Sequence, residues 1–307
     1  MQTLPIGLRL EHLRIDSVLG SGGSGVTYRA IDVRNQRAVA LKEYFPTSWS
    51  VRSPDGRVLV VNKRFEPDFR RGLDRFIIEA ETLARFRNAH IVRIERVFGA
   101  MGTGFIQLEY LTGPTVSAWS DCNPAPPGQS QLDGFAGALL EALAVIHAAG
   151  VLHCDIGPRN ILLSAAGLPI LIDFGSARRA IGALTAMTKI FVTPHYAPQE
   201  LYISTTTQRG PWTDIYAAAA VLYWLVQGAP PPAAPSRAIS GGKTLKFDTH
   251  ARSRYRADFL SAIAWGLEFA PEARPRTANE WHTALLGRER KRRSAGLNML
   301  PVRNTTD

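Results

Sequence analysis

The sequence predicts an α+β protein with a β-rich first part and a mostly helical second part. Up to about residue 110, short strand-like runs alternate with turn signals such as Pro-Asp-Gly at 54–56. One helical pattern interrupts these runs at 72–87, where apolar residues recur at helix spacing. Later patterns are helical, notably 134–150 and the almost wholly apolar segment 214–232. We therefore expect a β-rich lobe with one main helix, followed by a mostly helical lobe.

The composition shifts suggest domain boundaries. We expect an N-terminal extension at 1–13, a first lobe at 14–111, a second lobe at 112–287 and a tail at 288–307. A hairpin-like insertion is expected within the first lobe at about 46–70. It could bind a partner or brace the main helix, and both interpretations stay open.

Composition also bears on location. The chain has 307 residues, of which 45% are hydrophobic, enough for a sizeable core. No apolar run approaches the roughly 20 residues of a membrane span, and the first residues lack the apolar core of a signal peptide. Cys122 and Cys154 are the only cysteines, too few for a disulfide framework. We expect a cytoplasmic protein without a transmembrane segment.

The formal net charge is +10, and part of it lies in the run RERKRR at 288–293. Such a tail is either a solvated segment or a binding site for nucleic acid or anionic lipid. The first interpretation is favoured, because the sequence has no zinc-finger spacing and no interleaving of aromatic and basic residues.

The segment LGSGGSGVTY at 19–28 places Gly20, Gly22 and Gly25 between two strand-like runs. Glycines let backbone N–H groups approach phosphates closely. A dinucleotide fingerprint requires a helix directly afterwards, whereas a strand-like run follows here. The alternatives are a plain flexible hairpin and a glycine-rich flap over a nucleotide, and the second fits better.

Lys42 lies in the apolar run AVALKEY. A buried lysine without a partner is costly, so Lys42 either sits at a surface edge or faces phosphates while a carboxylate holds it. Glu79 is the candidate carboxylate, because its apolar neighbours Ile78 and Leu83 suggest that the helix packs inward there.

Two nearby segments, VLHCDIGPRNILL at 151–163 and ILIDFGSAR at 170–178, place Asp155, Asn160 and Asp173 among apolar strands. Acidic groups in such settings need partners. An aspartate can accept a proton from an attacking hydroxyl, and amide and carboxylate oxygens suit Mg²⁺. Phosphoryl transfer needs mainly positioning and charge neutralisation, which these residue types supply.

Taken in order, these motifs resemble the eukaryotic-type (Hanks-type) protein kinases, particularly the bacterial serine/threonine protein kinases, from about residue 14 to 286. Their order is specific, with Asn160 thirteen residues before Asp173. The resemblance implies a bilobal protein-kinase fold with ATP in the cleft between the lobes, Mg²⁺ or Mn²⁺ as the metal, and protein substrates. Autophosphorylation is compatible with it.

The resemblance also implies residue roles. Asp155 corresponds to the catalytic base, and Lys42 to the ligand of the α- and β-phosphates, paired with Glu79. Asn160 and Asp173 correspond to the metal ligands. Thr27 stands where the family usually has valine. Leu108 is the gatekeeper, and Glu109 to Leu111 form the hinge. The implied ATP contacts are Leu19, Gly20, Ser21, Gly22, Gly23, Ser24, Gly25, Thr27, Ala40, Lys42, Leu108, Glu109, Leu111 and Leu162.

Further residues correspond to structural or regulatory positions of the family. His153, Phe174 and Leu83 fit a stacked column that links the lobes. Glu200 is expected to pair with Arg274, and Asp214 to anchor the catalytic loop. Thr193 resembles the Ser/Thr-specific pattern. The implied structural and regulatory set is Glu79, His153, Phe174, Thr193, Glu200, Asp214 and Arg274.

The sequence departs from the family at three points. Cys154 replaces an arginine that binds a phosphorylated activation loop, which suggests activity without loop phosphorylation; Cys154 is either a neutral filler or redox-sensitive. Gly157 replaces a lysine that usually contacts the γ-phosphate, and we hypothesise that Arg159 supplies this charge as a catalytic residue. Lys42 and Glu79 are 37 residues apart, more than is usual in the family, and the expected insertion would account for the extra length.

We expect a serine/threonine protein kinase. The alternative is a pseudokinase that holds nucleotide as a binding or scaffold module, and the changes at Cys154 and Gly157 motivate it. A small-molecule phosphotransferase fits less well, because the segment APQE at 197–200 resembles the end of a protein-kinase activation segment.

Overall fold

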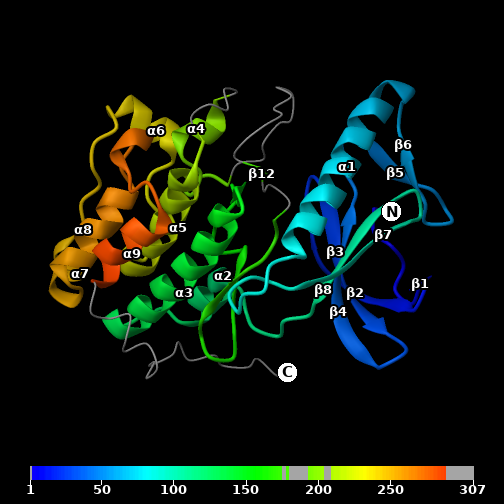
Figure 1. Cartoon of the computed structure of the whole chain (residues 1–307), viewed down its shortest axis with the longest axis horizontal. Coiled ribbons are helices and arrows are strands. Elements are labelled where there is room, and N and C mark those ends of the chain that lie inside the picture. The colour runs from blue at the N-terminus through cyan, green and yellow to red at the C-terminus, as the bar shows by residue number, and fades with distance from the viewer. Residues whose placement is uncertain (1, 175–177, 180–192, 204–208, 288–307) are drawn as a thin grey trace. The chain divides into compact units, whose positions relative to one another are not determined.

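The computed structural model describes residues 2–174, 178–179, 193–203 and 209–287. The chain divides into two compact units (Figure 1). The first contains the residues up to Arg87 together with Val92–Thr112, and the second contains Asn88–Ile91 and the residues from Gly113 onward. The predicted α+β organisation, with one β-rich and one mostly helical part, is confirmed.

The first unit is built on a six-stranded antiparallel sheet with the order β1-β2-β3-β4-β8-β7. Its strands are Arg9–Leu10 (β1), Leu13–Ser21 (β2), Gly25–Asp32 (β3), Arg37–Tyr44 (β4), Ile94–Ala100 (β7) and Thr103–Glu109 (β8). Alternation along β4 sends Leu41 and Glu43 into the core and leaves Ala40 and Lys42 half-buried on the opposite face. The sheet therefore presents Lys42 on its less buried face.

Residues 2–13 are integrated into the first unit rather than extending from it. Leu4 and Leu10 are buried in the same core cluster as Tyr28. The backbone N–H of Leu4 also donates to the Tyr28 hydroxyl oxygen at 3.0 Å. The expected N-terminal extension is thus part of the packed lobe.

The main helix of the first unit, α1, spans Glu66–Leu83 and packs along β7 and β8 (Figure 1). It begins before the predicted residue 72, because Pro67 and two acidic residues in the first turn favour a start at Glu66. It also ends before the predicted residue 87. Leu83 is buried, but Ile78 is 55% exposed, so the inward packing expected around Ile78 is wrong.

The expected insertion contains a two-stranded hairpin and the start of α1. The hairpin pairs β5 (Ser50–Arg52) with β6 (Val58–Val60), and the 3-10 helix η1 (Lys63–Phe65) leads into α1. Arg52 Nη2 lies 2.7 Å from Glu43 Oε2, and both side chains are almost fully buried. This ion pair fastens the hairpin to β4, the strand that carries Lys42.

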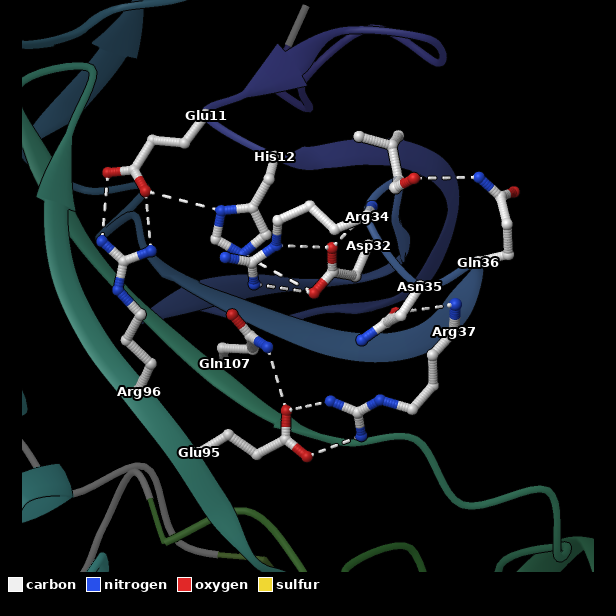
Figure 2. A network of polar contacts seen from close by, with 11 residues as sticks. Glu11, His12, Asp32, Arg34, Asn35, Gln36, Arg37, Glu95, Arg96 and Gln107 are labelled. Atoms are coloured by element: carbon white, nitrogen blue, oxygen red, sulfur yellow. Dashed lines mark hydrogen bonds and ion pairs between the residues drawn. The ribbon is translucent and has the colours of Figure 1, made fainter.

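A polar network covers another part of the first unit (Figure 2). Arg34 donates to both carboxylate oxygens of Asp32, and its hydrogen bond lowers the pKa of Asp32 to about 2. Arg37 makes a similar two-point contact with Glu95. Because these acids are already paired with arginines, the network links turns to strands and does not provide a set of open metal ligands.

The second unit is organised around α5. Its helices are Val116–Cys122 (α2), Gln129–Ala148 (α3), Gln199–Tyr202 (α4), Pro211–Gln227 (α5), Ala234–Ile239 (α6), Thr249–Arg254 (α7), Ala257–Gly266 (α8) and Ala278–Leu286 (α9), with the 3-10 helix η3 at Pro271–Ala273. Helix α5 is buried nearly all round and ends at Gly228, whose φ of 74° forms a left-handed cap.

Short strand pairs hold the loops of the second unit. Strand β9 (Val151–Leu152) pairs with β12 (Arg178–Arg179), and β10 (Ile161–Leu163) pairs with β11 (Pro169–Leu171). The segment Asn88–Ile91 joins this unit because the His90 carbonyl accepts from the Leu171 N–H at 2.9 Å. Among the helices of the described residues, none has the length and apolar character to cross a membrane.

Candidate active site

The loop between β9 and β10 is held by the first turn of α5. Asp214, in the first turn of α5, accepts hydrogen bonds from the backbone N–H groups of His153 and Cys154, each at 2.8 Å. His147 Nε2 also lies 2.8 Å from Asp214 Oδ2. Burial acts to raise the pKa of Asp214, but the contact with His147 outweighs it and holds the pKa below its ordinary value. An ionised Asp214 therefore anchors the loop.

Asp155 is the central carboxylate of this loop. Its Oδ1 accepts from the Thr193 hydroxyl at 2.6 Å, and its Oδ2 accepts from Asn160 Nδ2 at 2.9 Å. Burial raises the pKa of the Asp155 carboxyl; the negative charge of Asp173 adds to this, and the hydrogen bond from Thr193 opposes it. The result is an oriented carboxylate that accepts a proton more readily than an ordinary aspartate.

Asn160 and Asp173 supply oxygen atoms beside Asp155. Asn160 Nδ2 donates to the backbone oxygen and to Oδ2 of Asp155, which leaves its amide oxygen as an acceptor. The Asp173 side chain is exposed. Cys154 and Asp173 have φ values of 60° and 57°. Such backbone strain at non-glycine residues is concentrated at functional sites.

His153 and Phe174 make the ring contact expected of the predicted column. Their ring centroids are 4.6 Å apart, and His153 is fully buried, with Nε2 3.1 Å from the Ile172 carbonyl oxygen. Leu83, the third predicted member, is buried in the first unit. A column running through both units stays a prediction.

The glycine-rich segment forms the β2–β3 hairpin, in which Gly20 lies opposite Thr27. A Cβ at Gly20 or Gly22 would meet open space, so packing does not explain these two glycines. A Cβ at Gly25 would instead collide with the Glu43 carbonyl oxygen, so this glycine permits close strand packing. The strand that follows agrees with a flap rather than a dinucleotide fingerprint.

The predicted adenine and phosphate residues of the first unit share one sheet face. Lys42 on β4 lies opposite Thr27 on β3, and Ala40 lies opposite Leu108 on β8. Glu109 ends β8, where its Oε1 accepts from the Arg93 N–H at 2.7 Å. The pairing of Lys42 with Glu79 stays a prediction, with Lys42 on β4 and Glu79 on α1, both half-buried.

The expected pairing of Glu200 with Arg274 is present. Arg274 Nη1 lies 2.7 Å from Glu200 Oε1, and both side chains are fully buried. Thr213 donates to the same oxygen at 3.0 Å, and Arg274 Nη2 donates to the Phe269 carbonyl at 2.8 Å. This cluster joins the segment after Thr193 to the helical core of the second unit.

The remaining predicted residues differ in burial. Arg159 is exposed. A Cβ at Gly157 would make only ordinary contacts, 3.9 Å from Thr193 and Tyr196 atoms. Cys154 is buried, with a relative exposure of 4%. Thr185 and Thr188, which precede the APQE segment, and the basic run 288–293 lie outside the described residues.

Sequence reasoning missed three features. His147, the partner of Asp214, had no local signal. The hydrogen bond of Thr193 to Asp155 joins residues 38 apart, which no spacing rule predicts. The Glu43–Arg52 pair was detectable in part, because strand alternation next to Lys42 places Glu43 in the core, where it needs a counter-ion.

The chain is similar to known proteins over most of its length. The family model of the protein kinase domain matches residues 13–284. Serine/threonine-protein kinase PknE of Mycobacterium bovis is 29% identical over 315 residues, covering 97% of this chain and 51% of PknE. Serine/threonine-protein kinase PknD of Mycobacterium tuberculosis is 32% identical over 234 residues, covering 75% of this chain and 32% of PknD. The chain thus spans about half of one relative and a third of the other.

A solved structure, the PpkA-294 apo form, is similar over 93% of this chain and all of that chain. The sequences are 36% identical, and the TM-score is 0.79.

Proposed function

Because the chain belongs to the protein kinase family, we propose that it transfers the γ-phosphoryl group of ATP to serine and threonine hydroxyls of proteins. The observation that carries this proposal is the Asp155 carboxylate, which is held at one oxygen by Thr193 and at the other by Asn160. A fixed proton acceptor beside amide and carboxylate oxygens is what phosphoryl transfer to a hydroxyl requires.

In the proposed reaction, the substrate hydroxyl oxygen bonds to the γ-phosphorus while the bond from that phosphorus to the ADP oxygen breaks. The proton of the hydroxyl passes to the Asp155 carboxylate. The burial that raises the pKa of Asp155 makes it a stronger base. Thr193 and Asn160 orient the carboxylate and leave a lone pair on each oxygen for the incoming proton.

The oxygen donors of the site fit Mg²⁺, and the same oxygens can bind Mn²⁺. The amide oxygen of Asn160 and the carboxylate of Asp173 would hold the metal, because hard oxygen donors suit such ions. The described residues contain no group of three or more acidic, histidine or cysteine side chains able to hold a metal without help. When bound, the metal would be held through few carboxylates together with the phosphates, whose negative charge it would neutralise.

Each unit contributes its own candidate nucleotide contacts. In the first unit, Gly20 and Gly22 leave the backbone open to phosphates, and Lys42 supplies a positive charge. The face shared by Thr27, Ala40 and Leu108 would contact the adenine, with Glu109 to Leu111 bonding its edge. Leu162 on β10 is the corresponding apolar contact of the second unit.

We propose that Arg159 supplies the charge that Gly157 cannot. Arg159→Ala is then expected to lower turnover by roughly 10²-fold, the effect of losing one preorganised charge at the transition state. A Cβ at Gly157 would make no close contact, so adding Gly157→Lys to this variant is expected to recover part of the turnover. Steady-state kinetics with a threonine peptide make the measurement. Wild-type turnover in Arg159→Ala, or no recovery in the double variant, would count against the role.

We also propose that activity does not require phosphorylation of the activation loop. The neutral, buried Cys154 stands where the family has the arginine that binds a phosphorylated loop. Alanine at both Thr185 and Thr188 is therefore expected to leave kcat within about twofold of wild type, since no phosphate-binding arginine is available there to be satisfied. Initial rates of both proteins after phosphatase treatment provide the comparison, and a collapse of the variant's rate would refute the independence.

The proposed function is tested with purified protein, labelled ATP and peptide libraries that carry serine, threonine or tyrosine as the only acceptor. We expect label on serine and threonine peptides, and on the protein itself if it autophosphorylates. A chelator is expected to abolish labelling, and added Mg²⁺ or Mn²⁺ to restore it. Nucleotide binding without transfer would instead support the scaffold alternative that Cys154 and Gly157 motivate.

A further inference from the structure

The second unit has a pocket at α6 and the loop that follows it. Its volume is about 250 Å³. Its polar lining residues are cationic or hydroxyl-bearing, and none is acidic: Ser236, Arg237, Ser240, Lys243, Thr244 and Lys246. None of these residues belongs to the phosphoryl-transfer site described above.

Arg237 is buried in the wall of this pocket without an acidic partner. Its relative exposure is 3%. Nη1 donates to the Tyr216 hydroxyl at 3.0 Å and to the Leu267 carbonyl at 2.7 Å, and Nη2 donates to the Lys243 carbonyl at 3.2 Å. Nε has no acceptor. Within the described part of the chain, no carboxylate forms an ion pair with Arg237.

Arg274, another buried arginine of this unit, differs from Arg237 in having an acidic partner. Arg274 is buried to the same degree but is neutralised by Glu200. A buried charge without a counter-ion is costly. Arg237 therefore raises the positive potential of the pocket that it lines, and an anion entering the pocket would reduce this cost.

Two lysines add to the same potential. Lys243 and Lys246 are exposed, and neither forms an ion pair with any described residue. Two acids lie close to this loop: Glu268 accepts from the Thr244 hydroxyl at 2.9 Å, and Asp248 follows Lys246 by two residues. Three of the residues that line the pocket are cationic and none is acidic, so the pocket attracts anions.

We propose that this pocket binds an acidic side chain of the protein substrate, either a phosphorylated residue or a cluster of carboxylates. The proposal rests on the proposed function and adds a specificity subsite to it. Arginine and lysine with neighbouring hydroxyls are the groups that recognise phosphate and carboxylate.

Two observations favour a protein segment over a free ion. Ile239, at the end of α6, is 90% exposed, and a docked chain would cover this apolar side chain. The loop that precedes α6 also contacts the segment beside the candidate active site. His195 Nδ1 lies 2.8 Å from the Pro231 carbonyl oxygen, and Thr193, two residues before His195, donates to Asp155. The segment from Thr193 to His195 therefore contacts both Asp155 and the residue next to Pro232, which lines the pocket.

A purely structural role for Arg237 explains only part of the site. Its bonds to Leu267 and Lys243 link α6 to the segments around it. They do not explain why two further cations without partners line the same pocket. The test therefore uses the exposed lysines, whose replacement leaves the buried contacts of Arg237 in place.

The experiment measures binding of three labelled peptides to the full chain without nucleotide, by fluorescence anisotropy. The peptides share one threonine acceptor and differ in a Glu-Glu-Glu triplet, a single phosphoserine or a Gln-Gln-Gln triplet. Both acidic peptides are expected to bind more tightly than the glutamine peptide, and less tightly as salt rises. The variant Lys243→Ala/Lys246→Ala is expected to weaken acidic-peptide binding roughly 10-fold.

The matched control, Lys63→Ala/Arg252→Ala, also removes two exposed cations but does not touch the pocket. It is expected to bind like wild type. Tighter binding of the phosphoserine peptide identifies a phosphorylated ligand, and tighter binding of the glutamate peptide identifies a carboxylate cluster; both support the pocket. Equal binding of all three peptides, or equal losses in the two variants, would overturn it.

Kinetics separate this proposal from the proposed function. The ratio of kcat/KM for the acidic over the glutamine peptide is expected to fall in Lys243→Ala/Lys246→Ala. Acidic-peptide binding without any phosphate transfer would contradict the kinase activity and leave the pocket intact. Transfer with no preference between peptides would contradict the pocket alone.

Discussion

Asp155→Asn is expected to reduce phosphate transfer by roughly 10²- to 10⁴-fold, the range lost with a positioned general base. An amide cannot accept the proton of the substrate hydroxyl. The replacement fits the site, because the Thr193 hydroxyl can accept as well as donate and the amide oxygen can still accept from Asn160. The loss would therefore come from chemistry and not from collapse of the loop.

Single-turnover assays with labelled ATP measure this loss most cleanly, together with the thermal unfolding midpoint of the variant. A matched control is Asp121→Asn, which neutralises an exposed acid on α2. The control is expected to transfer phosphate at the wild-type rate. Undiminished transfer in Asp155→Asn would remove Asp155 from the mechanism.

Glu200→Gln is expected to lower the free energy of unfolding by about 3–5 kcal/mol, the cost of breaking a buried ion pair from one side. Arg274 would keep its carbonyl acceptors but lose the only carboxylate that neutralises it among the described residues. The hydroxyl of Thr213 would also lose its charged acceptor. The segment from Thr193 to Glu200 would then be held less firmly against α5.

Denaturant unfolding followed by far-UV circular dichroism reports mainly the helices of the second unit and suits this test. Asp121→Asn provides the control, because it neutralises an exposed acid on α2 of the same unit. Removing an exposed charge of this kind changes stability by under about 1 kcal/mol. A loss in Glu200→Gln no larger than in this control would show that the buried pair does not stabilise the unit.

The candidate site could be predicted from the sequence where the signal was local. Asp155 and Asn160 lie five residues apart in one short loop between apolar strands, and the structure joins them by two hydrogen bonds. The glycine-rich segment, for which a nucleotide flap was favoured over a plain hairpin, likewise connects two paired strands as its flanking runs predicted. In both cases a short stretch of chain limits where its own residues can go.

Contacts set by tertiary packing were beyond the sequence. The loop at His153 and Cys154 is held by Asp214, some 60 residues further along, and Asp214 is in turn held by His147 on α3. Resemblance to a family implied the first contact but not the second. Polar residues in helices are common, and nothing in the local sequence separates a buried His147 from an exposed one.

The bounds of the main helix were predicted wrongly for a different reason. Its predicted start at residue 72 followed the apolar spacing, but its first turn is set by Pro67 and nearby acidic residues that lie outside that spacing. Ile78 was taken as inward-facing from its apolar character, yet it is exposed. An apolar residue on a helix is a weak indicator of burial when its neighbours on the same face are not considered.

The central claim is tested most directly by incubating the purified chain with ATP, Mg²⁺ and a serine/threonine peptide, then measuring the intact mass of the peptide. The account predicts one added phosphoryl group on the peptide with the wild-type chain, and an unchanged peptide with Asp155→Asn. An unmodified peptide in the presence of a wild-type chain that demonstrably binds ATP would contradict it.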